Sequence, residues 1–372
     1  MQHTKINHEA LEKLRARLGK PVQRVTPPFY TEINADAARH FASSIGDDNP
    51  LYVDPEYAAK SRWKSGLATP CILYSTNNVV SGAVEGLPGV HAMFAGTDWT
   101  WHQPIRHGTR IRTEATLKDL VEHETRFAGR AIQQIYAISF FDQNDTLLAT
   151  ADSWCFRTER ESAKSEGKKY KEVEKAIRKY TEEELDVFRN QYRSEKRRGA
   201  ETRYFDDVNV GDQIDTILKG PYTLTSVIAF MQSWGNYGTQ NHRIAWDYFD
   251  KHPKLAIPNA YGVPEGPARV HWDAEFAREV GVPAPYDFGP ERIAWLSHLM
   301  TDWMGDDGFL RRLNVRVRDH NLLGDATWCK GTVTGKRVED GKAIVSADVW
   351  CENQRGARTA VGSAEVILPT KS

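Results

Sequence analysis

The chain has 372 residues, of which 40% are hydrophobic and 27% are charged, and its formal net charge is -1. This length suffices for two or more domains, and the composition is that of an ordinary soluble globular protein. The balanced charge gives no general electrostatic attraction for nucleic acid or a membrane surface. No apolar run approaches the ~18 residues of a membrane span. We therefore expect neither partner.

The four cysteines, Cys71, Cys155, Cys329 and Cys351, are widely scattered. No two have the spacing of a zinc clip, so no metal site is expected. Reduced, buried thiols are typical of a cytoplasmic protein. The segment from Met1 to Lys20 also lacks the apolar core of a signal peptide, which favours a cytoplasmic location.

The first half of the chain begins with helical patterns and continues with strand patterns. Helices are predicted over 5–18, from Asn34 or Asp36 to Ile45, over 55–60, and over the apolar run 71–84. Residues rich in β-branched and aromatic side chains then predict strands over 93–105, 110–121, 128–142 and 146–157. Helices followed by consecutive strands favour an α+β fold over alternating βα units.

A charged segment over 158–203 separates the two halves. Thr181-Glu182-Glu183-Glu184 is a helix start signal and predicts a helix to Arg198. The run from Arg193 to Arg198 is basic. It is either a solvated helix face or part of a site for phosphates.

The second half repeats the first. A strand and turn are predicted over 204–214, a helix over 225–234, an apolar helix over 291–304, and closing strands over 344–351 and 360–368. Phe230 matches Phe41 at a separation of 189 residues, whereas His271 matches Tyr52 at 219. The difference predicts an insertion of 30 residues within about 237–269. We expect an N-terminal domain over 1–157, a linker over 158–203 and a C-terminal domain over 204–372.

One motif resembles a known family. The block Gly46-Asp47-Asp48-Asn49-Pro50-Leu51-Tyr52-Val53-Asp54-Pro55-Glu56-Tyr57-Ala58 is similar to the hydratase signature of the MaoC-like family, which contains the (R)-specific enoyl-CoA hydratases. His271-Trp272-Asp273-Ala274-Glu275-Phe276-Ala277 is a partial second copy. The resemblance covers about 20–157 and 204–368. It implies a tandem (double) hotdog fold, in which each half wraps an antiparallel sheet around a central helix.

The resemblance implies water addition to, or removal from, the 2,3 double bond of an acyl-CoA thioester. This reaction needs a base, an acid and donors for the developing oxyanion. Tyr52 stands where the family has its catalytic histidine, so His271 is the expected general base. The amide of Gly289 is the expected oxyanion donor at a helix N-terminus. Neither half has an intact Asp/His dyad, and the partner of His271 is left open between Asn236, Glu265 and other groups.

Further residues are expected around the substrate: Asp47, Asn49, Tyr52, Tyr286, Asp287 and Arg292. Aromatic residues in the insertion favour a bulky or cyclic acyl group, as in fatty acid or steroid-like acyl metabolism. CoA enters as part of the substrate, and no cofactor is expected. A hotdog thioesterase that uses Asp287, or a non-catalytic acyl-CoA-binding protein, are the alternatives. Two hotdogs in one chain form a pseudo-dimer, so a monomer or a homodimer is compatible with the sequence.

Overall fold

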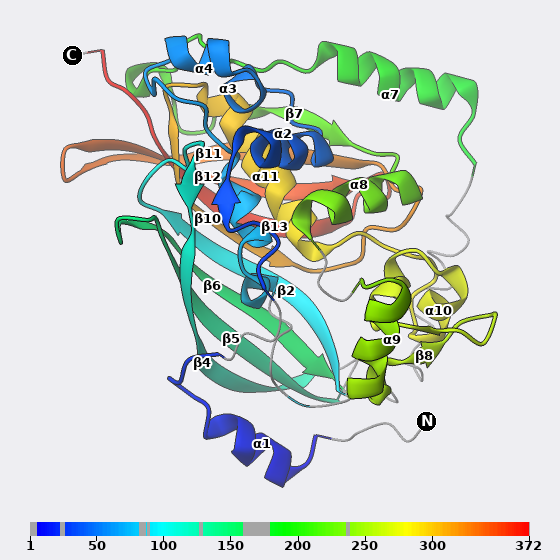
Figure 1. Cartoon of the computed structure of the whole chain (residues 1–372). Helices are drawn as coiled ribbons and strands as arrows, with labels where there is room; N and C mark the ends of the chain where they lie inside the picture. Colours follow the sequence, from blue (N-terminus) through cyan, green and yellow to red (C-terminus); the bar gives the residue numbers. More distant parts are fainter. Residues whose placement is uncertain are drawn as a thin grey trace.

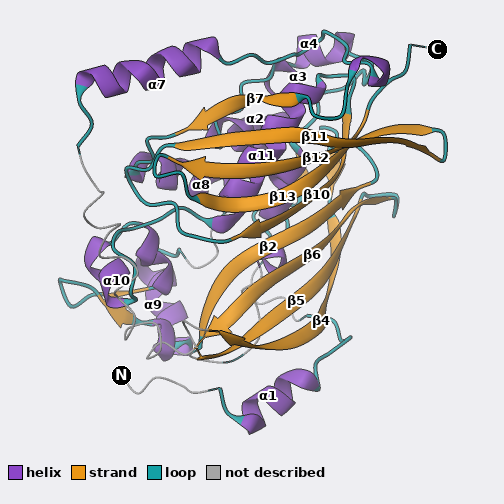
Figure 2. Ribbon diagram, turned by 180° about the vertical axis from the view of Figure 1, so that it is seen from behind, coloured by secondary structure: helices purple, strands orange, loops and turns teal. Residues whose placement is uncertain are grey.

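The protein is built on one nine-stranded antiparallel sheet with helices against one of its faces (Figures 1 and 2). The computed structural model describes residues 6–22, 27–81, 87, 90–125, 129–158, 179–235 and 239–371. The strand order is β4 (Arg112–Thr125), β5 (Gly129–Phe141), β6 (Leu147–Thr158), β2 (His91–Trp101), β10 (Phe309–Val317), β13 (Arg358–Ile367), β12 (Lys342–Asn353), β11 (Thr327–Glu339) and β7 (Gln213–Lys219).

The two halves of the chain meet inside this sheet. β2 of the first half pairs with β10 of the second half, with Trp99 opposite Leu313. Each half places consecutive antiparallel strands on its own side of this seam. The predicted α+β double hotdog fold is confirmed. The domain limits at 157 and 203 stay a prediction.

The central element is α11 (Gly289–Met304), which packs against strands of both halves. Pro290 in the first turn favours helix initiation. Gly305, with φ 73°, ends the helix in a backbone conformation that favours glycine. Every residue from Pro290 to Met304 is buried, so its polar side chains need partners inside the protein.

Within its described residues, the first half has no matching long helix. We expected a helix over 71–84, but the chain forms two short 3₁₀ segments, η1 (Pro70–Ser75) and η2 (Asn78–Ser81). Between them, the Thr76 hydroxyl donates to the Leu73 carbonyl, and the Asn77 side chain accepts from the Val79 amide. Such side-chain bonds to the backbone compete with α-helix formation, which explains the error. Residues 82–86 lie outside the described part.

Five other helices correspond to predicted ones: α1 (His8–Arg15), α2 (Ala35–Ser44), α4 (Pro55–Lys60), α7 (Glu182–Ser194), which ends before the expected Arg198, and α8 (Leu224–Trp234). The structure adds α3 (Pro50–Val53), α9 (His242–Lys251) and α10 (Ala274–Glu279). Asn34 caps α2, and Thr181 with Glu184 forms a capping box on α7. The strand expected over 204–214 is wrong in position, because η3 (Phe205–Asp207) precedes β7.

Equivalent contacts recur in the two halves. α2 packs against α8, and the rings of Phe41 and Phe230 lie 6.2 Å apart. Leu67 forms a β-bridge with Arg106, and Tyr286 forms the corresponding one with Leu322. Short strands β1 (Glu32–Ile33) and β3 (Thr109–Arg110) pair in the first half. η4 (Pro253–Leu255) and strands β8 (Ile257–Pro258) and β9 (Pro264–Glu265) lie within the predicted insertion.

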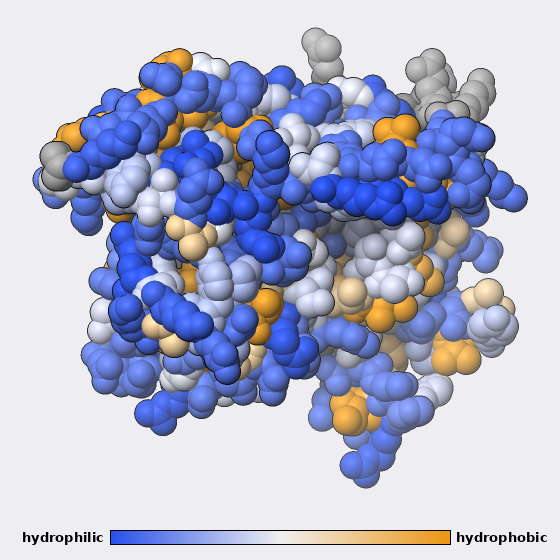
Figure 3. Space-filling view, turned by 90° about the horizontal axis from the view of Figure 1, so that it is seen from above, coloured by the Kyte–Doolittle hydropathy of each residue, from blue (hydrophilic) through white to orange (hydrophobic). Residues whose placement is uncertain are grey.

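The surface is mostly hydrophilic, and the cysteines lie in the interior, as the composition led us to expect. Seen from above, hydrophilic side chains dominate, and apolar side chains form small, separate groups (Figure 3). In the described part of the chain, no helix combines the length and the apolar character that crossing a membrane requires. All four cysteines are buried free thiols.

A glycine in β13 tests the sheet packing. A Cβ on Gly362 would lie 2.0 Å from the backbone oxygen of Asn314, whereas a Cβ on Gly335 would meet its nearest atom at 3.9 Å. We expect Gly362→Ala to lower the free energy of unfolding by roughly 2 kcal/mol or more, because the backbone must move. Gly335→Ala is the matched control and should change it by less than about 1 kcal/mol. Denaturant unfolding measures both; equal effects would contradict this packing.

Candidate active site

One face of α11 is polar and borders a cavity. Glu291, Trp295, His298 and Asp302 follow one another at intervals of four, three and four residues, which places them on one side of the helix. All four line a cavity of about 750 Å³. Lys219 of β7 and residues after α7 complete its walls. This volume lies within the usual range of small-molecule sites.

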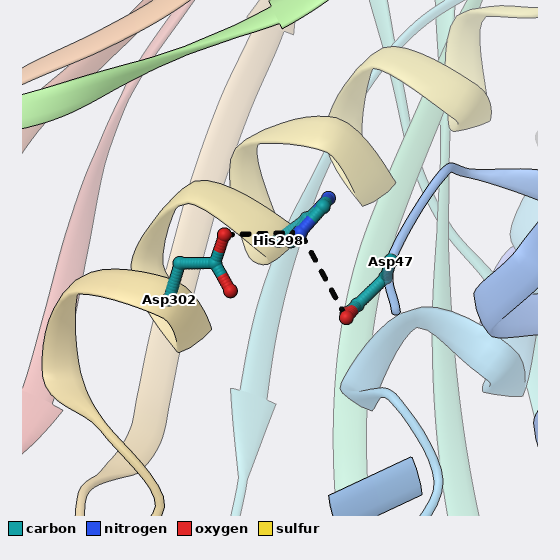
Figure 4. Close-up of side chains that lie close together, drawn as sticks. All are labelled: Asp47, His298 and Asp302. Carbon is teal, nitrogen blue, oxygen red and sulfur yellow. Dashed lines mark ion pairs between the residues drawn. The ribbon is translucent and has the colours of Figure 1, made fainter. Parts of the chain in front are cut away.

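Three acid–base side chains meet at one end of this face (Figure 4). His298 Nε2 lies 3.1 Å from Asp302 Oδ2 and 3.8 Å from Asp47 Oδ1. Asp302 lies one helical turn after His298, whereas Asp47 comes from the turn between α2 and α3. Asp47, His298 and Asp302 are 2%, 6% and 9% exposed. The two halves of the chain therefore build this cluster together.

Lys219 determines which nitrogen of His298 accepts. Its ammonium lies 2.7 Å from His298 Nδ1 and donates to the Ile45 carbonyl at 2.6 Å. Because lysine only donates, Nδ1 is the acceptor in this contact. The neutral imidazole then carries its hydrogen on Nε2, the nitrogen that faces the two carboxyl groups.

Burial changes the proton affinity of every member of the cluster. Burial lowers the pKa of His298 to about 4, although the charge of Asp47 opposes this change. Burial raises the pKa of Asp302 to about 7, against the opposing charges of Lys219 and Arg197. Burial also raises the pKa of Asp47. Near neutral pH the site thus holds a neutral histidine beside a carboxyl group that can gain or lose a proton.

The same three residues offer ligand atoms within 4.8 Å of one another, a spacing that suits a metal ion. However, the Nε2 hydrogen imposed by Lys219 occupies the position that a metal would take on His298. The ammonium is also a nearby positive charge. The arrangement suits proton transfer better than cation binding.

The hydratase-like motif positions Asp47 through a tight turn. Gly46 has φ 69°, and Asp47 Oδ1 accepts from the Asn49 amide at 3.0 Å. Asn49 itself caps α3 and donates to Asp306. Tyr52 is 4% exposed, and burial holds the pKa of its hydroxyl well above the usual value. Of the first-half residues expected near substrate, Asp47 alone joins the cluster.

The basic run after α7 lies at the His298 end of the cavity. The Arg198 amide donates to the Asp302 carbonyl at 3.2 Å. Arg197 pairs with Asp48, and Arg198 pairs with Glu201 at 2.9 Å. Lys196 and Arg203 form no ion pair within the described residues, although Arg203 donates to the Trp303 carbonyl at 2.6 Å and lies over the Trp303 ring. The positive charge at this mouth of the cavity is therefore only partly neutralised by carboxylates.

His271 belongs to a different environment. It ends η5 (Pro267–His271), its Nδ1 lies 2.8 Å from the Tyr286 carbonyl oxygen, and its ring lies 3.8 Å from the ring of Phe288. His271 is thus close to Gly289, the first residue of α11. A Cβ on Gly289 would lie 2.4 Å from Phe94, so packing alone requires glycine there.

Other predicted residues have structural partners. Asp287 is 1% exposed and forms an ion pair of 2.7 Å with Arg292, and burial raises its pKa to about 7. Arg292 also donates to the carbonyls of Asp319 and Thr359. This corrects the expectation that Arg292 meets substrate, since its guanidinium is enclosed by protein groups. Tyr286 packs between the rings of His271 and His320.

The two expected partners of His271 remain untested. Asn236 lies outside the described residues. Glu265 is in β9, accepts from Asn259 at 3.0 Å and lies 3.8 Å from Arg269. It lines a separate pocket of about 300 Å³ within the predicted insertion, together with Trp246 and Phe249.

Comparisons with known proteins agree with this fold. Residues 22–150 match the model of the FAS1-like dehydratase domain region. A UPF0336 protein of Streptomyces griseus is 27% identical over 136 residues, which are 35% of this chain and 87% of that protein. A UPF0336 protein of Streptomyces avermitilis is 26% identical over 26% of this chain, and the match spans 65% of its own length.

Solved structures match over nearly the whole chain. A MaoC-like dehydratase superposes with a TM-score of 0.67 at 15% identity, covering 96% of this chain and 100% of that one. A MaoC domain protein dehydratase from Chloroflexus aurantiacus gives 0.61 at 12% identity, covering 96% of each. A conserved hypothetical protein of Mycobacterium tuberculosis with a double hotdog fold gives 0.54 at 10% identity, covering 92% and 96%.

These matches define the fold of the protein. The chain has a double hotdog fold like that of MaoC-like dehydratases, and its residues 22–150 are similar to the FAS1-like dehydratase domain region. The resemblance seen in the sequence is confirmed at this level.

Sequence reasoning missed His298, Asp302, Lys219 and Glu291. A signal was present, because three ionisable residues recur on one face of an otherwise apolar helix. The apolar residues predicted the helix, but they do not reveal that its polar face lines a cavity. Lys219 carried no such signal, since it precedes Gly220-Pro221 at the end of a strand.

The raised pKa of Asp302 gives a stability test. In the unfolded chain an Asp releases its proton near pH 3.9, whereas in the folded protein Asp302 does so near pH 7. The folded state therefore binds more protons between these values, and this contribution to stability is lost as pH rises through 7. We expect Asp302→Asn to raise the free energy of unfolding at pH 8 by roughly 1–3 kcal/mol, with little change at pH 4.

Denaturant unfolding at both pH values measures this difference. Asp247→Asn is the matched control, because Asp247 is exposed on α9. Its effect should be small and equal at both pH values. Equal destabilisation by Asp302→Asn at pH 4 and pH 8 would contradict the pKa assignment.

Proposed function

We propose that the protein is a hydratase or dehydratase acting on the 2,3 double bond of an acyl-CoA thioester. One observation carries the proposal: Asp47 of the hydratase-like motif lies 3.8 Å from His298. Neither half contains an intact Asp/His dyad in its sequence motif, but the fold brings a carboxyl group and a histidine together. The family resemblance and the adjoining cavity support the same reaction class.

The cluster contains the groups that the reaction needs. In hydration, a carboxylate accepts a proton from water, the water oxygen bonds to C3, and an acid delivers a proton to C2. Asp302 and Asp47 are the proposed proton acceptors. His298 gives its Nε2 proton to C2 while its Nδ1 takes a proton from Lys219, so the imidazole stays neutral, and the proton removed from water returns to Lys219 through solvent in the cavity. Lys219 has a third ammonium hydrogen, not used by Ile45 or His298, for the thioester oxygen. Dehydration follows the same steps in reverse, and no redox cofactor is required.

The cavity also suggests an orientation for the substrate. Lys196 and Arg203 border its mouth near the C-terminal end of α11. Cationic side chains there suit the phosphates of CoA. The acyl group would then extend along α11 from His298 towards Glu291.

His271 with Gly289 is the alternative reaction centre. Gly289 precedes His298 by nine residues, or roughly 13 Å along a helix, so its amide cannot serve a reaction at His298. We favour the His298 centre because its carboxyl partners and cavity are defined. The thioesterase alternative loses support because Asp287 is paired with Arg292.

Two matched histidine variants test the proposal. Hydration of a panel of trans-2-enoyl-CoAs is followed by loss of the conjugated thioester absorbance. We expect His298→Ala to lower kcat by about 10²–10⁴-fold, since it removes an acid–base group. His271→Ala should lower it by less than about tenfold, the effect of a 1.4 kcal/mol change.

Thermal unfolding of each variant shows whether it folds. The reverse ranking of the two variants would move the centre to His271 and Gly289. Stoichiometric binding of CoA esters without any hydration would favour the non-catalytic alternative.

A further inference from the structure

Glu291 is a second buried acid in the same cavity. It is 2% exposed and lies in the first turn of α11, and its Oε2 accepts a hydrogen bond of 2.6 Å from the Tyr222 hydroxyl. Within the described residues, Oε1 has no hydrogen-bond partner. Because Glu291 and Tyr222 both line the cavity, a molecule inside it can reach this unpartnered oxygen.

Burial favours a protonated carboxyl group at Glu291, because it raises the pKa of this group well above its usual value. Tyr222 donates to Oε2, which leaves Oε1 to carry the hydrogen as a donor. A buried hydroxyl hydrogen without an acceptor costs about 1–3 kcal/mol, so the cavity favours a ligand that supplies one.

Glu291 lies on the same face of α11 as His298, at a distance that an acyl chain can span. Seven residues separate it from His298, which corresponds to roughly 10 Å along the helix. Trp295 lies between them on the same face, and its ring centroid lies 5.9 Å from that of Tyr222. An acyl chain that lies against Trp295 would therefore extend from the His298 cluster to Glu291.

The mixed charges near Glu291 favour an uncharged group at this place. Asp287 acts on Glu291 as a negative neighbour, and Lys219 and Arg292 act on it as positive neighbours. A plain hydrocarbon end would leave the carboxyl hydrogen unpaired. An uncharged oxygen acceptor satisfies both conditions.

We propose that the substrate's acyl group carries a hydroxyl or carbonyl oxygen roughly 10 Å beyond its reacting carbons, and that Glu291, supported by Tyr222, binds this oxygen. The inference rests on the proposed function for the identity of the reacting end. It defines the substrate class as oxygenated acyl thioesters rather than unsubstituted fatty acyl chains.

Binding of saturated thioesters tests this recognition without the reaction. Calorimetry compares decanoyl-CoA with 10-hydroxydecanoyl-CoA, together with the corresponding eight- and twelve-carbon pairs to vary the reach. We expect the parent protein to bind the hydroxylated member of the best-fitting pair at least tenfold more tightly, since a site built for a hydroxyl disfavours the analogue that lacks it.

Three variants assign the preference to these side chains. Glu291→Met should abolish it, because it removes the donor and keeps the length. The affinity for the methyl-terminated thioester should rise in this variant, since no carboxyl hydrogen is left unpaired. Glu291→Gln should retain it through the amide hydrogens. Tyr222→Phe keeps the ring contact with Trp295 and should reduce the preference. Thermal unfolding shows which variants fold, and Tyr222→Phe decides if Glu291→Met does not.

Equal affinities for both members of every pair would overturn the inference, as would a preference that survives Glu291→Met. The proposed function fails separately. If the protein hydrates enoyl-CoAs but shows no preference for oxygenated chains, only the inference about Glu291 is overturned, and the proposed function stands. Preferential binding without any hydration supports the recognition and contradicts the reaction.

Discussion

The contact between Lys219 and His298 holds the site together. Through its bonds to His298 Nδ1 and the Ile45 carbonyl, one ammonium group joins β7, α11 and the end of α2. These segments come from both halves of the chain. Because lysine can only donate, the contact also directs Nε2 of the histidine towards Asp47 and Asp302. The position and the tautomer of His298 thus depend on a single buried interaction.

Burial of the polar face of α11 costs folding free energy, and this cost indicates that the face has a function. Transferring carboxyl groups into the protein interior disfavours their charged forms, which is why the pKa of Asp302 rises to about 7 while that of His298 falls to about 4. If this face of α11 served only to pack against the protein interior, apolar residues would be expected at His298 and Asp302. Strongly altered proton affinities that gather around a cavity are typical of functional sites. Among the residues that the structure describes, Asp47 Oδ2 and Asp302 Oδ1 also lack hydrogen-bond partners.

The two hotdog halves have diverged in complementary ways. The second half keeps the long helix, whereas side-chain bonds from Thr76 and Asn77 break the first-half counterpart into 3₁₀ segments. The first half keeps the aspartate of the hydratase-like motif, whereas the second half supplies the histidine on its helix. Each half therefore retains a part that the other lacks, and the shared sheet holds the parts in contact.

The sequence alone determined the fold class and most of the elements, because local patterns express them directly. Alternating strands, the caps at Asn34 and Thr181, and the hydratase-like motif were all readable along the chain. The broken first-half helix was not, because side-chain bonds to the backbone overrode an apolar pattern. Tertiary structure alone decided that Asp47 lies beside His298, more than 250 residues away in the chain. Hydrophobic patterns specify which faces are buried, but contacts between distant polar groups depend on how the two halves pack.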